Sequence, residues 1–233
     1  MKTMMQEVPF RACALAAALG VMGCGSSGSA SPDGGTKPTG PILPWKTGNT
    51  WTYRVTDPNS VTTKVMTVGE SEAIGGTGPN ADQMALKVTT KTKDGTDQTL
   101  TWAAEVADAV VRYREQSYDA GTGLPKADDY YDPDKLWADG SAEHTTNGAS
   151  WLEVYTDTKI PVGGATGTGS ENRDLWTVTS DNESVTVPAG TFDAVVFQKA
   201  GSTNKTYWYV RGVGKVKETG GQVEELVSFM LTP

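Results

Sequence analysis

Four aspartates crowd one ten-residue stretch of this chain, DDYYDPDKLW at residues 128–137. They are Asp128, Asp129, Asp132 and Asp134. Carboxylate oxygens are hard ligands, and Ca²⁺ takes about six to eight of them. The spacing differs from that of an EF-hand loop, and Pro133 restricts how the backbone could wrap an ion. Two interpretations remain open: a weak calcium site, or a solvated turn whose Tyr130, Tyr131 and Trp137 pack against a sheet.

Groups for acid–base or nucleophilic chemistry are sparse in the sequence. His144 is the only histidine, which excludes a histidine-based metal cluster and leaves a Ser-His-Asp arrangement dependent on one residue. We expect it to be an exposed loop residue. The run PVGGATGTGS at 161–170 lacks the Gly-Lys-Ser/Thr ending of a phosphate loop and is expected to be a flexible connection. The sequence therefore predicts no catalytic residue, no cofactor and no enzyme activity.

The chain contains two cysteines, Cys13 and Cys24. Both lie in a segment without a strand or helix pattern to hold a closed loop, which disfavours a disulfide. A catalytic thiol needs a base and a rigid pocket, whereas Cys24 is followed by glycine and serine. Neither a disulfide nor a catalytic thiol is therefore expected at Cys24.

The first 23 residues have the build of a secretory signal peptide. Lys2 and Arg11 precede the apolar run ACALAAALGVM at 12–22. Eleven helical residues rise about 16 Å, well short of the ~30 Å hydrocarbon core of a bilayer. A buried N-terminal helix is the alternative interpretation of this run. We predict that residues 1–23 are a signal peptide.

The residues Val21, Met22, Gly23 and Cys24 resemble the lipobox of bacterial lipoproteins, with Met22 bulkier than the usual residue at its position. The resemblance implies that Cys24 carries a diacylglyceryl group and, after cleavage, an acyl chain such as palmitate on its amino group. The membrane would then be a partner through this lipid anchor. Gly25, rather than an aspartate, follows the cysteine, which by analogy favours the cell outer membrane.

Composition and charge describe the remainder of the chain. Its net charge of -8 comes from 20 basic and 28 acidic residues that are spread along the sequence, so nucleic acid is not an expected partner. Residues 25–44 are rich in Gly, Ser, Pro and Thr, which together with Cys24 indicates a lipidated tether at 24–44.

Residues 45–233 are predicted to form a single β-rich domain. Trp51, Tyr53 and Val55 alternate with polar residues, and similar short segments recur with Asp94-Gly95 as one candidate hairpin turn. Their spacing predicts an antiparallel sheet folded as a half-barrel, barrel or sandwich. Residues 117–150 have weak periodicity and are predicted to be one long irregular insertion.

The last third carries a second resemblance. VTVPAGTFDAVVF at 185–197, TYWYVRGVGKVKE at 206–218 and ELVSF at 225–229 follow an opening with Gly48, Trp51 and Tyr53. This pattern resembles exported bacterial proteins of unknown function grouped as TapB-like domains. The resemblance implies an antiparallel sheet protein at the cell envelope, with no catalytic residues to carry over.

The sequence thus supports one leading hypothesis and two alternatives. The leading hypothesis is a monomeric, lipid-anchored envelope protein with a non-catalytic binding or structural role. One alternative is a carrier or chaperone for an apolar ligand such as lipid, enclosed by a curved sheet with many aromatic residues. The other is a carboxylate-based hydrolase, for which the sequence selects no pair of acids. The concave face of the sheet, filled or open, discriminates among them.

Overall fold

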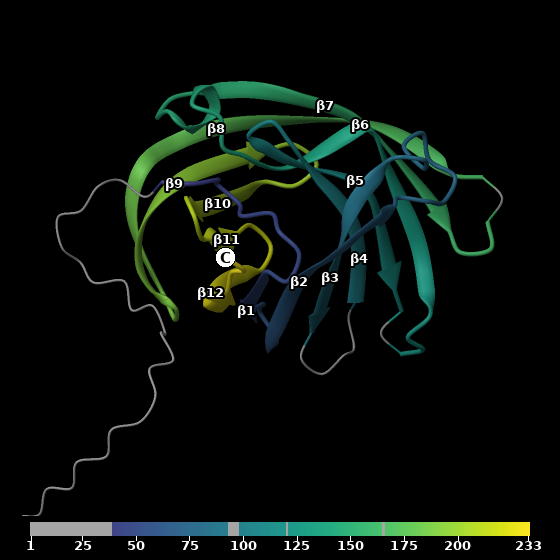
Figure 1. Cartoon of the computed structure of the whole chain (residues 1–233), viewed down its shortest axis with the longest axis horizontal. Coiled ribbons are helices and arrows are strands. Elements are labelled where there is room, and N and C mark those ends of the chain that lie inside the picture. The colour runs from purple at the N-terminus through teal and green to yellow at the C-terminus, as the bar shows by residue number, and fades with distance from the viewer. Residues whose placement is uncertain (1–38, 93–97, 120, 165) are drawn as a thin grey trace, which may run out of the picture.

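The alternating segments of the chain pair with their neighbours in sequence to form a closed antiparallel barrel in the computed structural model (Figure 1). The structure describes residues 39–92, 98–119, 121–164 and 166–233. In this part of the chain there are twelve strands and one short 3-10 helix, η1 (Glu143–Thr145). The strands are β1 (Thr50–Thr56), β2 (Val61–Ala73), β3 (Met84–Thr92), β4 (Gln98–Val106), β5 (Ala109–Tyr118), β6 (Pro125–Asp139), β7 (Ser150–Pro161), β8 (Thr168–Val187), β9 (Gly190–Ala200), β10 (Lys205–Val210), β11 (Gly214–Thr219) and β12 (Val223–Met230).

Closure depends on β1, which pairs with both β2 and β12. Its register with β12 runs from Thr50 opposite Met230 to Thr56 opposite Val223, with a bulge after Thr52. Each of the strands β2 to β11 pairs with the strands that precede and follow it in the chain, and β12 pairs with β11 and β1. The predicted antiparallel sheet is confirmed, and of its three possible closures the structure adopts the barrel.

The aromatic alternation in β1 selects the face that points inward. Trp51 and Tyr53 are almost fully buried, whereas Arg54 between Tyr53 and Val55 is exposed. Inside the barrel, Trp51 Nε1 donates a hydrogen bond to the Val213 carbonyl at 2.6 Å. The period of two therefore places one set of side chains in the core and the other in solvent.

The predicted long irregular insertion at residues 117–150 is wrong. The middle of this segment is the 15-residue strand β6, and the irregular parts are the connections on either side of it. Asp and Pro are poor strand formers, which hid the strand in the sequence. In the barrel, Asp128 pairs with Arg114 at 2.7 Å, and Pro133 lies where β6 has no partner in the ladders with β5 or β7, so its missing N–H costs no hydrogen bond.

The segment before β1 fills one end of the barrel. Ile42 and Leu43 are each 1% exposed and belong to the main core cluster, although the sequence placed both in the tether. The Gly212 N–H, in the β10–β11 turn, donates to the Pro41 carbonyl at 2.8 Å. Figure 1 shows this segment crossing inside the ring of strands. The folded domain thus begins before Trp45.

Gly214 shows why the Gly-Val-Gly-x-Val stretch requires glycine at this position. Its φ is +104°, a conformation that side chains rarely adopt. A Cβ here would lie 2.9 Å from Leu43 Cδ1 and 3.1 Å from Trp51 Nε1. The glycine therefore admits both the turn and the close packing of the N-terminal segment.

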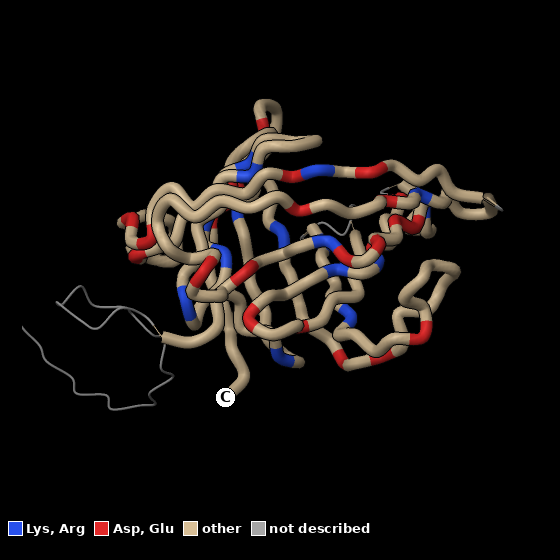
Figure 2. Tube along the Cα trace, turned by 90° about the horizontal axis from the view of Figure 1, so that it is seen from above, with Lys and Arg blue, Asp and Glu red and all other residues tan. Residues whose placement is uncertain are grey.

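Both signs of charge are distributed over the strands and their connections (Figure 2). No helix within the described residues has the length and apolar character needed to cross a membrane.

Candidate functional site

The barrel interior holds a cavity of about 350 Å³ beyond the part that the N-terminal segment fills. We call it the lumen cavity, and ten of the twelve strands or the connections beside them contribute to its wall. Thr203, in the β9–β10 connection, also lines it. An adjoining hollow of about 410 Å³ shares Lys64, Thr90 and Thr99 with it and extends to the exposed Ser60 of the β1–β2 turn. The cavity thus extends toward the end of the barrel opposite Ile42 and Leu43.

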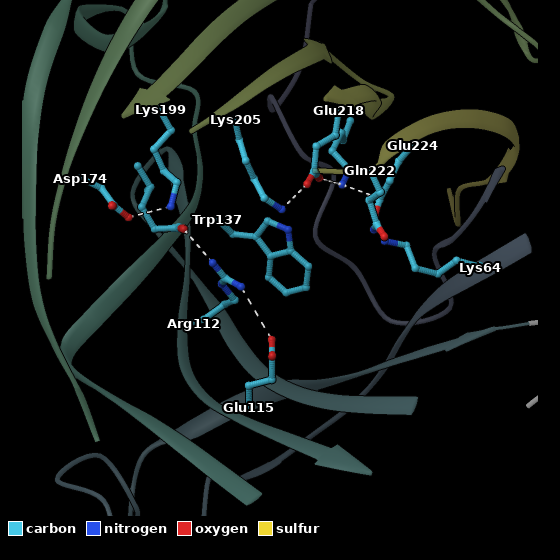
Figure 3. A network of polar contacts seen from close by, with 12 residues as sticks. Lys64, Arg112, Glu115, Trp137, Asp174, Lys199, Lys205, Glu218, Gln222 and Glu224 are labelled. Carbon is cyan, nitrogen blue, oxygen red and sulfur yellow. Dashed lines mark hydrogen bonds and ion pairs between the residues drawn. The ribbon is translucent and has the colours of Figure 1, made fainter. Parts of the chain in front are cut away.

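The wall of the lumen cavity is rich in charge (Figure 3). Its basic side chains are Lys64, Arg112, Lys135, Lys199, Lys205 and Lys215. Its acidic side chains are Glu115, Glu218 and Glu224. A protein with a net charge of -8 therefore lines this cavity with six basic groups against three acidic ones.

Five of these groups form one continuous chain of ion pairs, the lysine–glutamate network: Lys64, Glu224, Lys215, Glu218 and Lys205. Lys215 lies at its centre and contacts both glutamates, with 2.8 Å between Nζ and Glu224 Oε2. Gln222 Nε2 donates to the other oxygen of Glu224 at 2.6 Å. Each buried glutamate thus has at least two polar partners, which offsets its desolvation.

The pKa values in this network follow from its pairing. Burial raises the pKa of Glu224, but Lys215 and Lys64 outweigh it and hold that pKa far below 4.5. The pKa of Glu218 is lowered in the same way, mainly by Lys215 against burial. Burial lowers the pKa of Lys215, yet the two glutamates raise it well above 10.5. All three groups are therefore charged at neutral pH.

We call Arg112, Lys135 and Lys199 the cationic trio. Arg112 and Lys135 are paired less completely than the lysines of the network. Arg112 Nη1 lies 3.7 Å from Glu115 Oε2 and its Nη2 donates to the Leu136 carbonyl at 3.4 Å. Arg112 Nε is buried and has no hydrogen-bond partner. Lys199 pairs with the fully buried Asp174 at 2.7 Å.

Lys135 differs from the other lysines of the cavity wall. Its Nζ lies over the rings of Tyr131 and Tyr155, 4.8 and 5.1 Å from their centroids. Within the described residues, no carboxylate oxygen lies within 4.0 Å of it. Burial, together with repulsion from Arg112 and Lys199, lowers the pKa of Lys135 to about 8. At neutral pH the group still carries its charge.

Aromatic rings form the wall beside the trio. Trp176 stacks on Tyr207 with 5.6 Å between ring centroids, and Trp137 lies 5.3 Å from the Arg112 guanidinium. Trp176 Nε1 donates to Glu153 at 2.7 Å, which fixes the indole. The cavity therefore combines flat apolar faces with cationic groups, an arrangement suited to a ligand that has both a charged and an apolar part.

The four aspartates of the possible calcium site are not brought together. Asp128 pairs with Arg114 on one face of β6, while Asp129 pairs with Lys159 on the other at 3.0 Å. Asp132 is exposed and Asp134 is half-buried. Among the described residues, no group of three or more His, Cys, Asp or Glu side chains has a metal-binding arrangement.

His144 is half-buried rather than exposed. It lies on η1, its Nδ1 is 2.6 Å from Asp139 Oδ2, and its ring stacks on Trp151 with 3.9 Å between centroids. The contacts of Asp139 with His144 and Ser141 outweigh its burial and lower its pKa. This pair fastens the β6–β7 connection to the barrel.

Several sequence predictions fall outside the described residues. They are the signal peptide at 1–23, the lipidated Cys24 and the Asp94-Gly95 turn. The run at 161–170 forms the β7–β8 connection and the adjoining strand ends, with position 165 not described.

None of the lumen charges was identified from the sequence. The available signal was a charged residue within an apolar strand, as at Lys199 after VVFQ and Lys215 beside Val216. Alternation alone shows that such residues share a face, but not whether that face lies inside the barrel.

Comparison with known proteins does not assign the chain to a family. No protein family matches the sequence, and no curated protein matches it. Two solved structures cover 83% of this chain and 100% of their own lengths, each with a TM-score of 0.49. One is an inferred exported protein with a YmcC-like fold from Bacteroides fragilis, 12% identical, and the other an inferred lipoprotein from Parabacteroides distasonis, 14% identical. At these values the likeness identifies neither a family nor a function for this chain.

Proposed function

We propose that this chain is an exported, lipid-anchored protein of the cell outer membrane whose monomeric barrel binds a small polar ligand without chemical turnover. The lipobox-like residues ending at Cys24 support the anchor. The lumen cavity supports the binding role, and it is the observation that carries this proposal. Its volume of about 350 Å³ lies at the lower end of the range of small-molecule sites.

The charged wall favours a polar ligand over the apolar lipid considered from the sequence. An acyl chain in the lumen cavity would displace water from Lys135, Arg112 and Glu115 without replacing its hydrogen bonds. A ligand with polar or charged groups would satisfy those side chains. The aromatic faces of Trp137 and Trp176 can pack against its less polar part.

The two buried acids of the cavity wall, Glu218 and Glu224, support binding rather than hydrolysis. Glycoside hydrolysis needs one carboxylic acid that stays protonated near neutral pH. Lys215 lies between Glu218 and Glu224 and keeps the pKa of both low. Burial raises the pKa of Glu153, but both its oxygens accept hydrogen bonds, from the Leu136 N–H and Trp176 Nε1.

Obstruction of the lumen tests the binding role. Thr99 is half-buried at the cavity wall, whereas Thr63 is half-buried on the outer face of β2. Thr99→Trp and Thr63→Trp add the same bulk, one inside and one outside. We expect native mass spectrometry of the membrane-extracted chain to detect a bound small molecule in the wild type and Thr63→Trp, but not in Thr99→Trp. Equal occupancy in all three, or none in the wild type, contradicts lumen binding.

The anchor has a separate test. Cys24→Ala removes the thiol that would carry the lipid, so we expect the chain to keep its signal peptide and lose the mass of the acyl groups. Normal processing of Cys24→Ala would indicate cleavage by a peptidase that does not require the cysteine. Gradient fractionation of wild-type membranes then checks the outer-membrane location.

A further inference from the structure

The cationic trio has a charge arrangement that folding alone does not require. The cavity wall already contains a way of burying lysines, because the lysine–glutamate network gives Lys64, Lys205 and Lys215 each a carboxylate. Lys135 has aromatic neighbours instead, and the charges of Arg112 and Lys199 repel it. Burying a cation without a counter-charge is unfavourable.

The trio also has an unused hydrogen-bond donor. Arg112 Nε is buried and unpartnered, and the nearest carboxylate of the guanidinium, Glu115, is 3.7 Å away at Nη1. An arginine presents its donors as a planar fork that matches an oxyanion. Leaving one of them unsatisfied in a buried site costs stability, and a bound acceptor would recover it.

Acids near the trio offset part of its charge, but they lie beside Arg112 and Lys199 rather than Lys135. Glu115 is 3.7 Å from Arg112, and the fully buried Asp174 pairs with Lys199. Glu153 accepts hydrogen bonds from Trp176 and the Leu136 N–H. Asp157 influences Lys135, but burial and the neighbouring Asp129 raise its pKa, so it is a weakened counter-ion.

We propose that Arg112, Lys135 and Lys199 together bind an oxyanion group, a phosphate or carboxylate, of the small molecule that occupies the lumen cavity. This inference rests on the proposed binding function and names its ligand class: a small organic acid or phosphate ester. The oxyanion supplies the counter-charge that Lys135 lacks, and the rings of Trp137 and Trp176 line the adjacent wall for the remainder of the ligand.

Isothermal titration calorimetry on the membrane-extracted chain tests the site with two probes, inorganic phosphate and succinate. The variants are Lys135→Met, Arg112→Lys and Lys91→Met. The last is the matched control, because Lys91 is exposed on the outer face of β3. Lys135→Met removes repulsion, so it is expected to fold, and circular dichroism checks this.

At least one probe is expected to bind the wild type and Lys91→Met equally. Lys135→Met should weaken that binding at least about tenfold, because a hydrogen bond to a charged group is lost. Arg112→Lys keeps the charge but loses the planar fork, so it should also weaken binding. Phosphate binding without succinate binding would indicate a phosphate ester, and the reverse a carboxylic acid.

Two outcomes overturn the oxyanion site: neither probe binds the wild type, or Lys135→Met binds as tightly as Lys91→Met. The obstruction experiment with Thr99→Trp remains independent of both. If Thr99→Trp abolishes occupancy while the probes fail, the lumen binds a ligand of another class. If Thr99→Trp has no effect, the binding function itself fails.

Discussion

Replacement of Glu224 by glutamine tests whether the lysine–glutamate network stabilises the barrel. Glu224 is 2% exposed and contacts both Lys64 and Lys215. Breaking a buried ion pair on one side typically costs about 3–5 kcal/mol, and we expect the lower end because glutamine keeps one acceptor oxygen. For a chain of this size, a loss of about 3 kcal/mol lowers Tm by roughly 6–12 °C.

The neighbouring residue supplies the matched control. Glu225 lies on the opposite face of β12 and pairs with Arg54, whose side chain is 48% exposed. An exposed pair contributes about 0–1 kcal/mol, so Glu225→Gln should lower Tm by no more than about 4 °C. Differential scanning calorimetry measures both variants. Equal shifts in the two variants would refute the assigned role of the network.

A double-mutant cycle isolates the pair. Lys64→Met and Glu224→Gln remove the two partners singly and together, and contacting partners show coupling of about 0.5–3 kcal/mol. The folded-state pKa of Glu224 lies below 4.5, so its stabilisation is present above that pH and is lost as the pH falls toward the folded-state pKa. The difference in Tm between the wild type and Glu224→Gln should therefore shrink in acid. An absence of coupling, or a pH-independent difference, would contradict this account.

Three further predictions concern the cavity, the N-terminal segment and a turn. Burial and repulsion lower the pKa of Lys135 from 10.5 to about 8 in the folded chain. At neutral pH, Lys135 is therefore protonated in both the folded and the unfolded chain, and the folded state bears the full free-energy cost of the buried charge. Lys135→Met should raise stability at pH 7 by at most about 3 kcal/mol, and this gain should diminish between pH 8 and 10.5, as followed by urea denaturation. Leu43→Ala should cost about 3 kcal/mol because Leu43 is 1% exposed, whereas Leu152→Ala, at a residue 52% exposed, should change stability by less than about 0.5 kcal/mol in the same assay. Gly190→Val should lower Tm by several degrees, since φ at Gly190 is +141°. An unchanged Tm for Gly190→Val would show that the turn adapts to a side chain.

Local sequence patterns were sufficient for much of the fold. The alternation at Trp51 and Tyr53 predicts β1. The glycines at 212 and 214 permit a sharp turn or a bulge between two strands, and the structure has the turn between β10 and β11 there. Strand β6 was missed because its aspartates and Pro133 disfavour strands locally, whereas Arg114 and Lys159 stabilise two of those aspartates only after the strands pair. Ile42 and Leu43 were missed because two apolar residues between prolines show no periodicity.

The residues of the candidate site could be identified only from the tertiary structure. Asp128 and Asp129 are adjacent in the chain but lie on opposite faces of β6. The cluster of aspartates in the sequence therefore does not form a calcium site in the structure. Lys64 and Glu224 are 160 residues apart and meet because β1 pairs with both β2 and β12.

By itself, the sequence determined the strand class and the glycine turn between β10 and β11, because these depend on neighbouring residues and on a period of two. The lipid attachment at Cys24 stays a prediction. Tertiary structure decided that the sheet closes, that the N-terminal segment fills one end, and that the other end retains a charged cavity. The physical reason is that the alternation of apolar and polar residues defines two faces of a strand but does not show which face points into the barrel. Only the long-range pairing of β1 with β12 turns one face inward and brings charged residues from seven strands together.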